Sequence, residues 1–116
     1  MQIHLSPRHL KLTASIHGYV AEKIGHLEEL NEDILAAHVV LMHDQLKDPE
    51  KAYTVKLHLA LPGPDLYAED RESTLFAAID KVQDKVVQQL RKRKTRLKEK
   101  TKHTLRRAAE RKKSRG

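Results

Sequence analysis

The sequence predicts an α+β fold, a β-α-β-β-β-α two-layer sandwich in which a four-stranded sheet carries two helices on one face. Three observations predict it. Short segments of branched or alternating apolar residues indicate four strands, two longer segments have the apolar spacing of amphipathic helices, and these segments follow one another in that order. Both helices need an apolar surface, so one sheet face supplies it and the other is left to solvent.

The first strand and the first helix are predicted within the first thirty residues. QIHLS at residues 2–6 alternates like a half-buried strand, and Pro7 is expected to end it because proline donates no hydrogen bond to a ladder. Thr13 is the predicted N-cap of a helix over residues 14–29. The apolar stripe of that helix is spaced four, four and three, and consists of Ile16, Val20, Ile24 and Leu27.

Three further strands are expected in the middle of the chain. ILAAHVVLMH at residues 34–43 is rich in branched side chains, YTVKLHLAL at 53–61 alternates most clearly, and DLYAED at 65–70 is a short fourth strand. Asp48-Pro49 and the PGP segment are the turns between them. The helix between the first two strands makes them a parallel pair, whereas the later connections suit antiparallel hairpins.

The second helix begins near Ser73 and has no internal stop signal before Gly116. Its buried stripe consists of Leu75, Ile79, Val82, Val86 and Leu90. The apolar residues become sparse after Leu90, and a helix that is polar all round tends to fray unless a partner orders it. We therefore expect one domain over residues 1–94 and a basic C-terminal extension over residues 95–116.

The basic residues are concentrated at the end of the chain. Fourteen Lys/Arg and two Asp/Glu lie in residues 91–116, a local net charge of +12, whereas the first ninety residues have a net charge of −5. A polyanion relieves the repulsion within such a segment and releases its own counterions. On a helical wheel, a polar row also runs beside the buried stripe, away from Asp80 and Asp84. The row consists of Lys81, Lys85, Gln88, Lys92 and Arg96, with Gln89 on its margin. The alternative is a solvated helix face with no partner.

Structured RNA is the anionic partner that the composition favours. A membrane surface would need an apolar helix face that the basic end lacks, and no apolar run is long enough to span a bilayer. No DNA-reading motif is evident, and three Tyr and one Phe are too few for a stacking platform on single strands. Recognition of phosphates and of RNA shape remains.

The second helix also resembles a known family. LFAAIDKVQDKVVQQLRKRK at residues 75–94 is similar to the signature helix of the bacterial ribosome hibernation-promoting factors, also called ribosome-associated inhibitor or sigma-54 modulation proteins. The matching positions are Ala77, Ala78, Ile79, Asp80, Asp84, Lys85, Gln89, Leu90, Lys92 and Lys94. MQIHL at the start is also similar, as are Thr13, Lys23, Leu27 and Glu28, so the likeness covers about residues 1–98.

The resemblance implies a cytoplasmic, ribosome-associated hibernation factor that is monomeric when free and uses no cofactor. Such proteins bind the RNA of the small ribosomal subunit, and the whole ribosome, in the decoding channel. They thereby block messenger and transfer RNA and silence translation under stress or in stationary phase. The resemblance implies RNA-binding roles for Lys23, Lys85, Lys92 and Lys94. The wheel and the local charge add Lys81, Gln89, Arg91, Arg93 and Arg96. A generic structured-RNA-binding module and a protein-interaction regulator are the alternatives.

The chain also departs from the family pattern. Phe76 stands where relatives usually have tyrosine, which removes any hydrogen bond made by that hydroxyl. The basic end is longer than in short hibernation factors and opposite in charge to the acidic tail of the inhibitor branch. No C-terminal dimerisation domain follows, so the chain looks like a short form.

Eight histidines raise the question of a metal site. The alternation predicts His4, His38 and His58 on the open sheet face, as neighbours across three strands. Three imidazoles can hold zinc, but solvated surface histidines are the simpler interpretation and we expect no metal. The chain has no cysteine, no glycine-rich phosphate loop, no nucleophile elbow and no HExxH pair. We expect a binding protein and not an enzyme.

Overall fold

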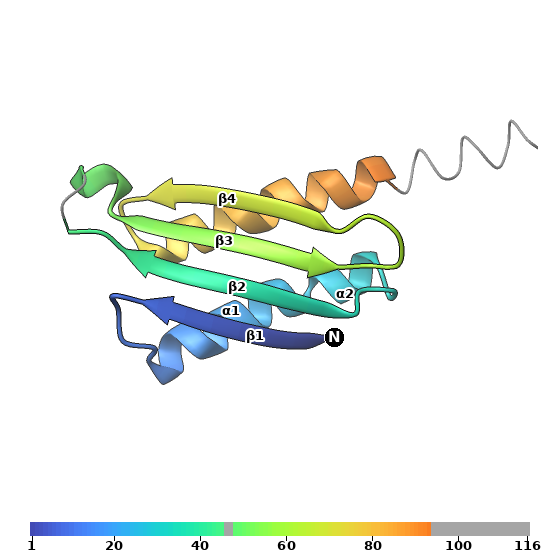
Figure 1. The fold of residues 1–116 in the computed structure, drawn as a ribbon, viewed down its shortest axis with the longest axis horizontal. Helices are drawn as coiled ribbons and strands as arrows, with labels where there is room; N and C mark the ends of the chain where they lie inside the picture. Colours follow the sequence, from blue (N-terminus) through green and yellow to red (C-terminus); the bar gives the residue numbers. More distant parts are fainter. Residues whose placement is uncertain (46–47, 94–116) are drawn as a thin grey trace, which may run out of the picture.

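In the computed structural model, which describes residues 1–45 and 48–93, a four-stranded sheet forms one layer and the helices lie along one of its faces (Figure 1). A helix that we call the long helix runs from residue 75 to residue 93, the last residue described. The preceding elements, in chain order, are β1 (Gln2–Arg8), α1 (Ala14–Gly25), α2 (Leu27–Leu30), β2 (Ala36–His43), the short 3-10 helix η1 (Pro49–Lys51), β3 (Tyr53–Ala60) and β4 (Leu66–Glu72).

The sheet has the predicted topology. Its strand order is β1-β2-β3-β4, with β1 parallel to β2 and the two later pairs antiparallel. The helical connection between β1 and β2 requires a crossover, and the shorter later connections form hairpins. The predicted α+β sandwich, with both helices on one sheet face, is therefore confirmed (Figure 1).

Three predicted boundaries are wrong. Pro7 does not end the first strand, because β1 continues through it to Arg8. This strand is at the sheet edge, where proline is tolerated. The expected helix over residues 14–29 is divided at His26 into α1 and α2, directly after Gly25, and glycine is a poor helix former. The fourth strand continues to Glu72, beyond the predicted residues 65–70.

The core lies between the sheet and the helices and is aliphatic. The predicted stripe of the long helix is buried at all five positions, and Ala78 is buried with it. In the first helical region Val20, Ile24 and Leu27 are buried, whereas Ile16 is half-buried. Each fully buried Val, Leu or Ile stabilises the fold by about 1.5–3 kcal/mol, so the two stripes fix which helix faces remain outside. No helix in the described part of the chain is long and apolar enough to cross a membrane.

Two threonines begin the helices. Thr13 caps α1 as predicted, and its hydroxyl accepts a hydrogen bond from the Ile16 N–H at 3.2 Å. Thr74 does the same at the start of the long helix, accepting from the Ala77 N–H at 3.2 Å. Such caps satisfy donors that have no partner within the helix, and each typically stabilises a helix by about 1 kcal/mol.

Candidate nucleic-acid interface

The long helix and α1 are joined by a polar seam. The Tyr19 hydroxyl donates a hydrogen bond to the Asp80 carboxylate at 2.6 Å, and the Lys23 ammonium lies 3.8 Å from the same carboxylate oxygen. The Gln83 amide donates to the Lys23 carbonyl at 2.7 Å, and the Phe76 ring meets the Tyr19 ring edge-on at 4.8 Å. Asp80 therefore faces α1, on the flank opposite to the lysine row, as the wheel predicts.

The seam changes the ionisation of Tyr19. The hydrogen bond to Asp80 is the main reason that the pKa of Tyr19 rises from 10.0 to about 12, and desolvation and the charges of Asp80 and Glu22 act in the same direction. The phenol donates its proton in this hydrogen bond, so losing the proton would break the bond and place two negative charges side by side. Tyr19 thus stays a donor throughout the physiological range and holds Asp80 between the two helices.

The opposite flank of the long helix lies along β4. Lys81 forms an ion pair with Glu72, and Lys85 lies 3.1 Å from the Asp70 carboxylate. The Lys85 ammonium also donates to the Glu69 carbonyl at 2.8 Å. The ion pair with Glu72 raises the pKa of Lys81. Partial burial opposes ionisation of Asp70 most strongly, but hydrogen bonds from the Arg71 N–H and Lys85 outweigh it and lower the pKa of Asp70.

The same flank continues with an amide and a guanidinium. Gln89 donates to the Tyr67 carbonyl at 3.2 Å, and Arg93 donates to the carbonyls of Pro62 and Pro64, each at 2.6 Å. Lys81, Lys85, Gln89 and Arg93 are spaced four residues apart and form one line, which we call the β4 row. Because β4 is an edge strand, these contacts also satisfy backbone acceptors that no further strand would pair.

Arg93 fixes the loop between β3 and β4 through a close approach. Gly63 has φ +83°, a left-handed conformation that glycine adopts readily. A Cβ atom at this position would lie 3.1 Å from an Arg93 guanidinium nitrogen. Glycine therefore allows both the turn and the contact with the long helix.

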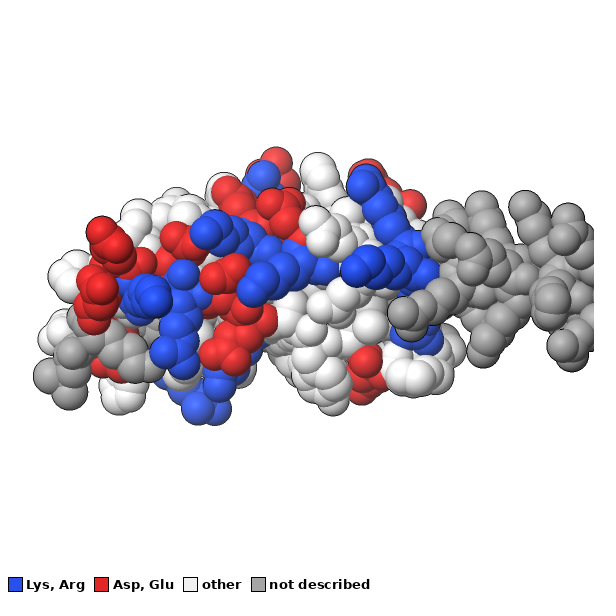
Figure 2. Space-filling model, turned by 90° about the horizontal axis from the view of Figure 1, so that it is seen from above, with Lys and Arg blue, Asp and Glu red and all other residues white. Residues whose placement is uncertain are grey.

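The β4 row remains accessible to a ligand. The side chains of Lys81 and Lys85 are 57% and 51% exposed, and ion pairs at such positions typically contribute less than about 1 kcal/mol. Figure 2 shows Lys and Arg side chains in a broken line along this side of the molecule, with Asp and Glu beside them over much of its length. An RNA phosphate can therefore replace a carboxylate at these lysines, and the neighbouring acids limit how closely a second phosphate approaches.

The predicted histidine neighbours do lie side by side on the open sheet face. His4 aligns with His38, and His38 with His58, and their ring centroids are 4.9 and 5.5 Å apart. Tyr67 of β4 extends the line, with its ring stacked on His58 at 4.4 Å. His58 Nε2 lies 2.7 Å from an Asp65 carboxylate oxygen, and this hydrogen bond is the main cause of the lowered pKa of Asp65. We call His4, His38, His58 and Tyr67 the ring row.

The ring row is not arranged as a metal centre. Within residues 1–45 and 48–93, no group of three or more His, Cys, Asp or Glu side chains is placed to hold a metal ion. The rings instead stack on one another, with interplanar angles of 12°, 31° and 12° along the row.

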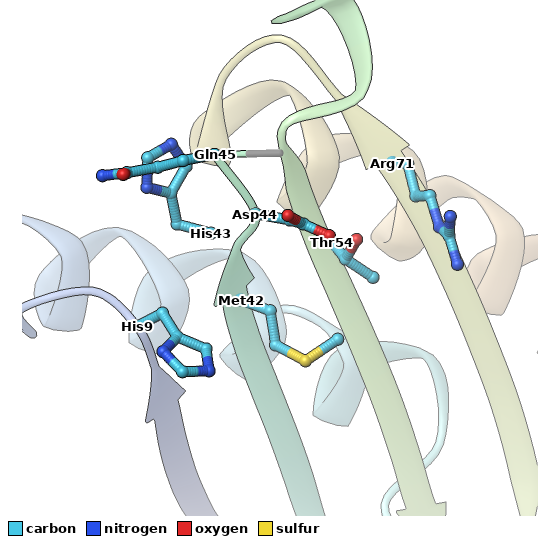
Figure 3. A pocket seen from close by; sticks show the side chains of 7 residues that line it. All are labelled: His9, Met42, His43, Asp44, Gln45, Thr54 and Arg71. Atoms are coloured by element: carbon cyan, nitrogen blue, oxygen red, sulfur yellow. The ribbon is translucent and has the colours of Figure 1, made fainter. Parts of the chain in front are cut away.

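A second feature of the open face is a hollow near the end of β2. Its volume is about 660 Å³, and Figure 3 shows Met42, Thr54 and Arg71 side by side on three neighbouring strands. His9, His43, Asp44 and Gln45 complete the lining. Thr54 is 3% exposed, and its cross-strand neighbours are Met42 and Arg71.

The profile of one protein family matches residues 3–98, and that family is described as sigma 54 modulation protein / S30EA ribosomal protein. The chain belongs to this family. The match covers both helices and all four strands, so the resemblance carried by the second helix is confirmed. The expectation of a binding protein and not an enzyme agrees with this family.

Family members among characterised proteins show the same relationship. The chain is 37% identical over 97 residues to the ribosome hibernation promotion factor of Deinococcus radiodurans, covering 83% of this chain and 51% of that protein. The ribosome hibernation promoting factor of Pseudomonas putida KT2440 is 31% identical over 94 residues, covering 81% of this chain and 87% of that protein. The chain therefore spans about half the length of the first relative and most of the second.

Solved structures of similar fold agree. The N-terminal domain of Thermus thermophilus Protein Y is superimposed with a TM-score of 0.67 at 28% identity, over 79% of this chain and 98% of that one. A ribosomal subunit interface protein from Coxiella burnetii gives a TM-score of 0.71 at 18% identity, over 82% and 99% of the two chains, which shows a shared fold.

The structure distributes the site residues predicted from the sequence over two flanks. Lys23 belongs to the seam with Asp80, whereas Lys81, Lys85, Gln89 and Arg93 form the β4 row. Lys92 and Arg91 are exposed on the long helix. Lys94 and Arg96, and the expected basic extension, lie outside the described residues.

Sequence reasoning missed the partners that hold these side chains. The Tyr19 hydroxyl and the acids of β4 both become visible only when the helix and the strand are placed together. The signal for β4 was present in its alternation, because Asp70 and Glu72 share a parity with Leu66 and Ala68, which pack against the core. Asp70 and Glu72, two residues apart on a strand, can therefore pair with Lys85 and Lys81, four residues apart on a helix that packs beside that strand.

Proposed function

We propose that this protein is a ribosome hibernation factor. In this proposal it binds small-subunit RNA in the decoding channel, blocks messenger and transfer RNA, and silences translation. The observation that carries it is the family match over residues 3–98, together with relatives at 37% and 31% identity that are named ribosome hibernation factors. The whole ribosome is a partner in the same proposal.

The surface chemistry supports an RNA partner. Lys92, with Lys81 and Lys85, presents cations along one helix, and the exposed ion pairs of the last two can exchange a carboxylate for a phosphate at little cost. Fourteen Lys/Arg in residues 91–116 add a strongly basic segment to the same end of the helix. Such contacts position a protein on an RNA through its phosphates and shape.

Cosedimentation tests the proposal. The full chain is mixed with purified small subunits, large subunits or whole ribosomes, and the pelleted fraction is measured together with the inhibition of cell-free translation. We expect saturable binding to small subunits and whole ribosomes, and inhibition at the same protein concentrations. Binding to large subunits or to bulk RNA with equal affinity would indicate a generic RNA-binding module. Translation without inhibition, and no pelleting, would indicate a protein-interaction regulator.

A further inference from the structure

We propose that the open face of the sheet is a second RNA-binding surface, which takes an unpaired strand by stacking a base on the ring row and holding phosphates at Arg8, Lys56 and Arg71. This surface is on the layer opposite to the helices (Figure 1). This inference rests on the proposed function, which is the reason to expect RNA here and not another polyanion.

The ring row ends in a position where a base can continue the stack. One ring stands on each strand, from His4 on β1 to Tyr67 on β4. One side of the Tyr67 ring packs on His58 at 4.4 Å, yet Tyr67 is 64% exposed because β4 is the edge of the sheet. Nucleobases of any identity stack on aromatic rings, and the rings used for this include histidine in addition to tyrosine. Counting only Tyr and Phe therefore underestimates the stacking surface.

A hollow lies directly beside this end of the row. It has a volume of about 530 Å³, and its lining includes His38, His58, Tyr67 and Lys56. The lining combines ring and aliphatic surface, against which a base can pack, with one cation, Lys56, for its phosphate and one acid, Glu69, beside that cation. Lys56 lies two residues before His58 on the same strand and is exposed.

The cations of the face lie on one side of the ring row. The strand register aligns Arg8 with Met42, Met42 with Thr54, and Thr54 with Arg71, so the two arginines lie at opposite edges of one cross-strand row. Arg71 also lines the 660 Å³ hollow, where Figure 3 shows it on β4 beside Thr54. Lys56 lies between this row and the ring row.

The acids near this face already have partners. Glu69 lies 3.8 Å from Arg71, Asp65 is hydrogen-bonded to His58 at 2.7 Å, and Asp44, which lines the 660 Å³ hollow, also has a partner. Glu69 is also the cross-strand neighbour of Lys56, so Arg8, Lys56 and Arg71 offer local phosphate contacts beside an aromatic row on a face where cations and acids alternate. A protein-docking face has an apolar centre depleted of charge, so this mixture of rings and cations fits a nucleic acid better.

RNA contacts on both layers have a mechanical consequence. The helices and the open face point in opposite directions from one sheet (Figure 1). A domain with both contacts would bridge two RNA segments, and its attachment would depend on having both within reach.

A short unpaired oligoribonucleotide that contains thiouridine tests the open face. Its affinity for the protein and the peptides that it photocrosslinks are both measured. The full-length protein is used at raised salt, which weakens phosphate contacts of the basic segments more than base stacking. We expect crosslinked peptides from β3 and β4, and an affinity that falls at least fivefold in Tyr67→Ala while Tyr67→Phe, which keeps the ring, binds like the original chain. Lys56→Gln should weaken binding, and the matched control Lys11→Gln should leave it unchanged.

Two outcomes would overturn the inference. One is crosslinking confined to the helices and the basic end, with unchanged affinity in Tyr67→Ala and Lys56→Gln. The other is loss of ribosome cosedimentation in Tyr67→Ala with unchanged oligoribonucleotide binding, which would make the face a protein-docking surface. Cosedimentation of the original chain separates the two proposals, because a chain that pellets with small subunits without sheet crosslinks contradicts only this inference. Thermal melting of Tyr67→Ala controls for folding.

Discussion

Individual cations of the long helix have partners within the protein, and these partners bear on the proposed contact with RNA. Lys85 contacts both the Asp70 carboxylate and the Glu69 carbonyl, so its ammonium is oriented by β4 in the protein alone. Lys92 is exposed about two turns further along the helix. Replacing Lys85 by an acid would remove support from β4 as well as a phosphate contact. Lys92 is therefore the cleaner position for a test of RNA binding.

Lys92→Gln should weaken ribosome binding without changing the fold. Loss of one phosphate contact should reduce the slope of log affinity against log salt by about one. The matched control is Lys51→Gln on η1, which removes an equal charge from an exposed position away from the long helix. Ribosome affinity measured at several salt concentrations compares the three proteins. Equal slopes for Lys92→Gln and the original chain would show that this face of the helix does not contact RNA.

Tyr19 provides a prediction about pH. Its pKa is about 12 in the folded chain and 10.0 ordinarily, so the Tyr19–Asp80 contact stabilises the fold fully below pH 10. That contribution is lost as the pH rises from about 10 to about 12, because the unfolded chain releases the proton first. A titration of tyrosinate absorbance should show a last step near pH 12 that is missing in Tyr19→Phe. A last step that persists in Tyr19→Phe would contradict the assignment.

At the scale of elements, the long helix both covers the core and closes the β4 edge. The sequence is sufficient to predict the strand order, since alternation, connection length and handedness leave few topologies open. It is also sufficient to place His4, His38 and His58 side by side, because residues of equal parity on paired strands become neighbours, whereas the stacking of Tyr67 on His58 is seen only in the structure. It failed at Pro7, where the penalty for a missing donor depends on whether the strand is an edge, and at His26, where a local turn interrupts the helical spacing.

The β4 row escaped prediction for the same kind of reason. A helical wheel groups Lys81 and Lys85 correctly, but it carries no information on the element that faces them. It placed Gln88 and Lys92 in the row, whereas the structure continues it through Gln89 and Arg93. The two pairs are neighbours on the helix surface, but only Gln89 and Arg93 contact the edge strand β4 and the loop before it.

Arg93→Ala should loosen the loop between β3 and β4. The variant loses two hydrogen bonds to the carbonyls of Pro62 and Pro64, which we expect to cost about 1 kcal/mol. Amide exchange in residues 61–66 should then be roughly fivefold faster, since local opening controls it. Lys92→Ala, next to it on the same helix, is the control and should leave exchange in the loop unchanged. Equal protection in Arg93→Ala would show that the guanidinium does not hold the loop.

At the scale of the whole molecule, an acidic body is combined with a basic end. The first ninety residues have a net charge of −5 and residues 91–116 one of +12, so the last segment would supply most of the long-range attraction in the proposed binding to RNA. The α+β body supplies a defined shape with the long helix on one side and the ring row on the other. We infer that the basic end increases affinity and the body selects the site.

Truncation after Lys94 tests whether the basic end increases affinity while the body selects the site. The core stripe ends at Leu90, so the body should keep its melting temperature. Ribosome affinity should fall, and the remaining binding should depend less on salt because fewer counterions are released. Parallel binding isotherms at low and moderate salt compare the truncated and full-length proteins. Identical affinity and identical salt dependence would show that residues 95–116 do not contact RNA.

Directed hydroxyl-radical probing shows which part of the small-subunit RNA lies next to the long helix. The chain has no cysteine, so Gln88→Cys places a single attachment point for an iron chelate on an exposed position of the long helix. We expect strong cuts in the small-subunit RNA that lines the decoding channel, and their loss when messenger and initiator transfer RNA are bound first. Cuts restricted to the outer surface of the subunit, or cuts unaffected by messenger and transfer RNA, would contradict the proposed binding in the decoding channel.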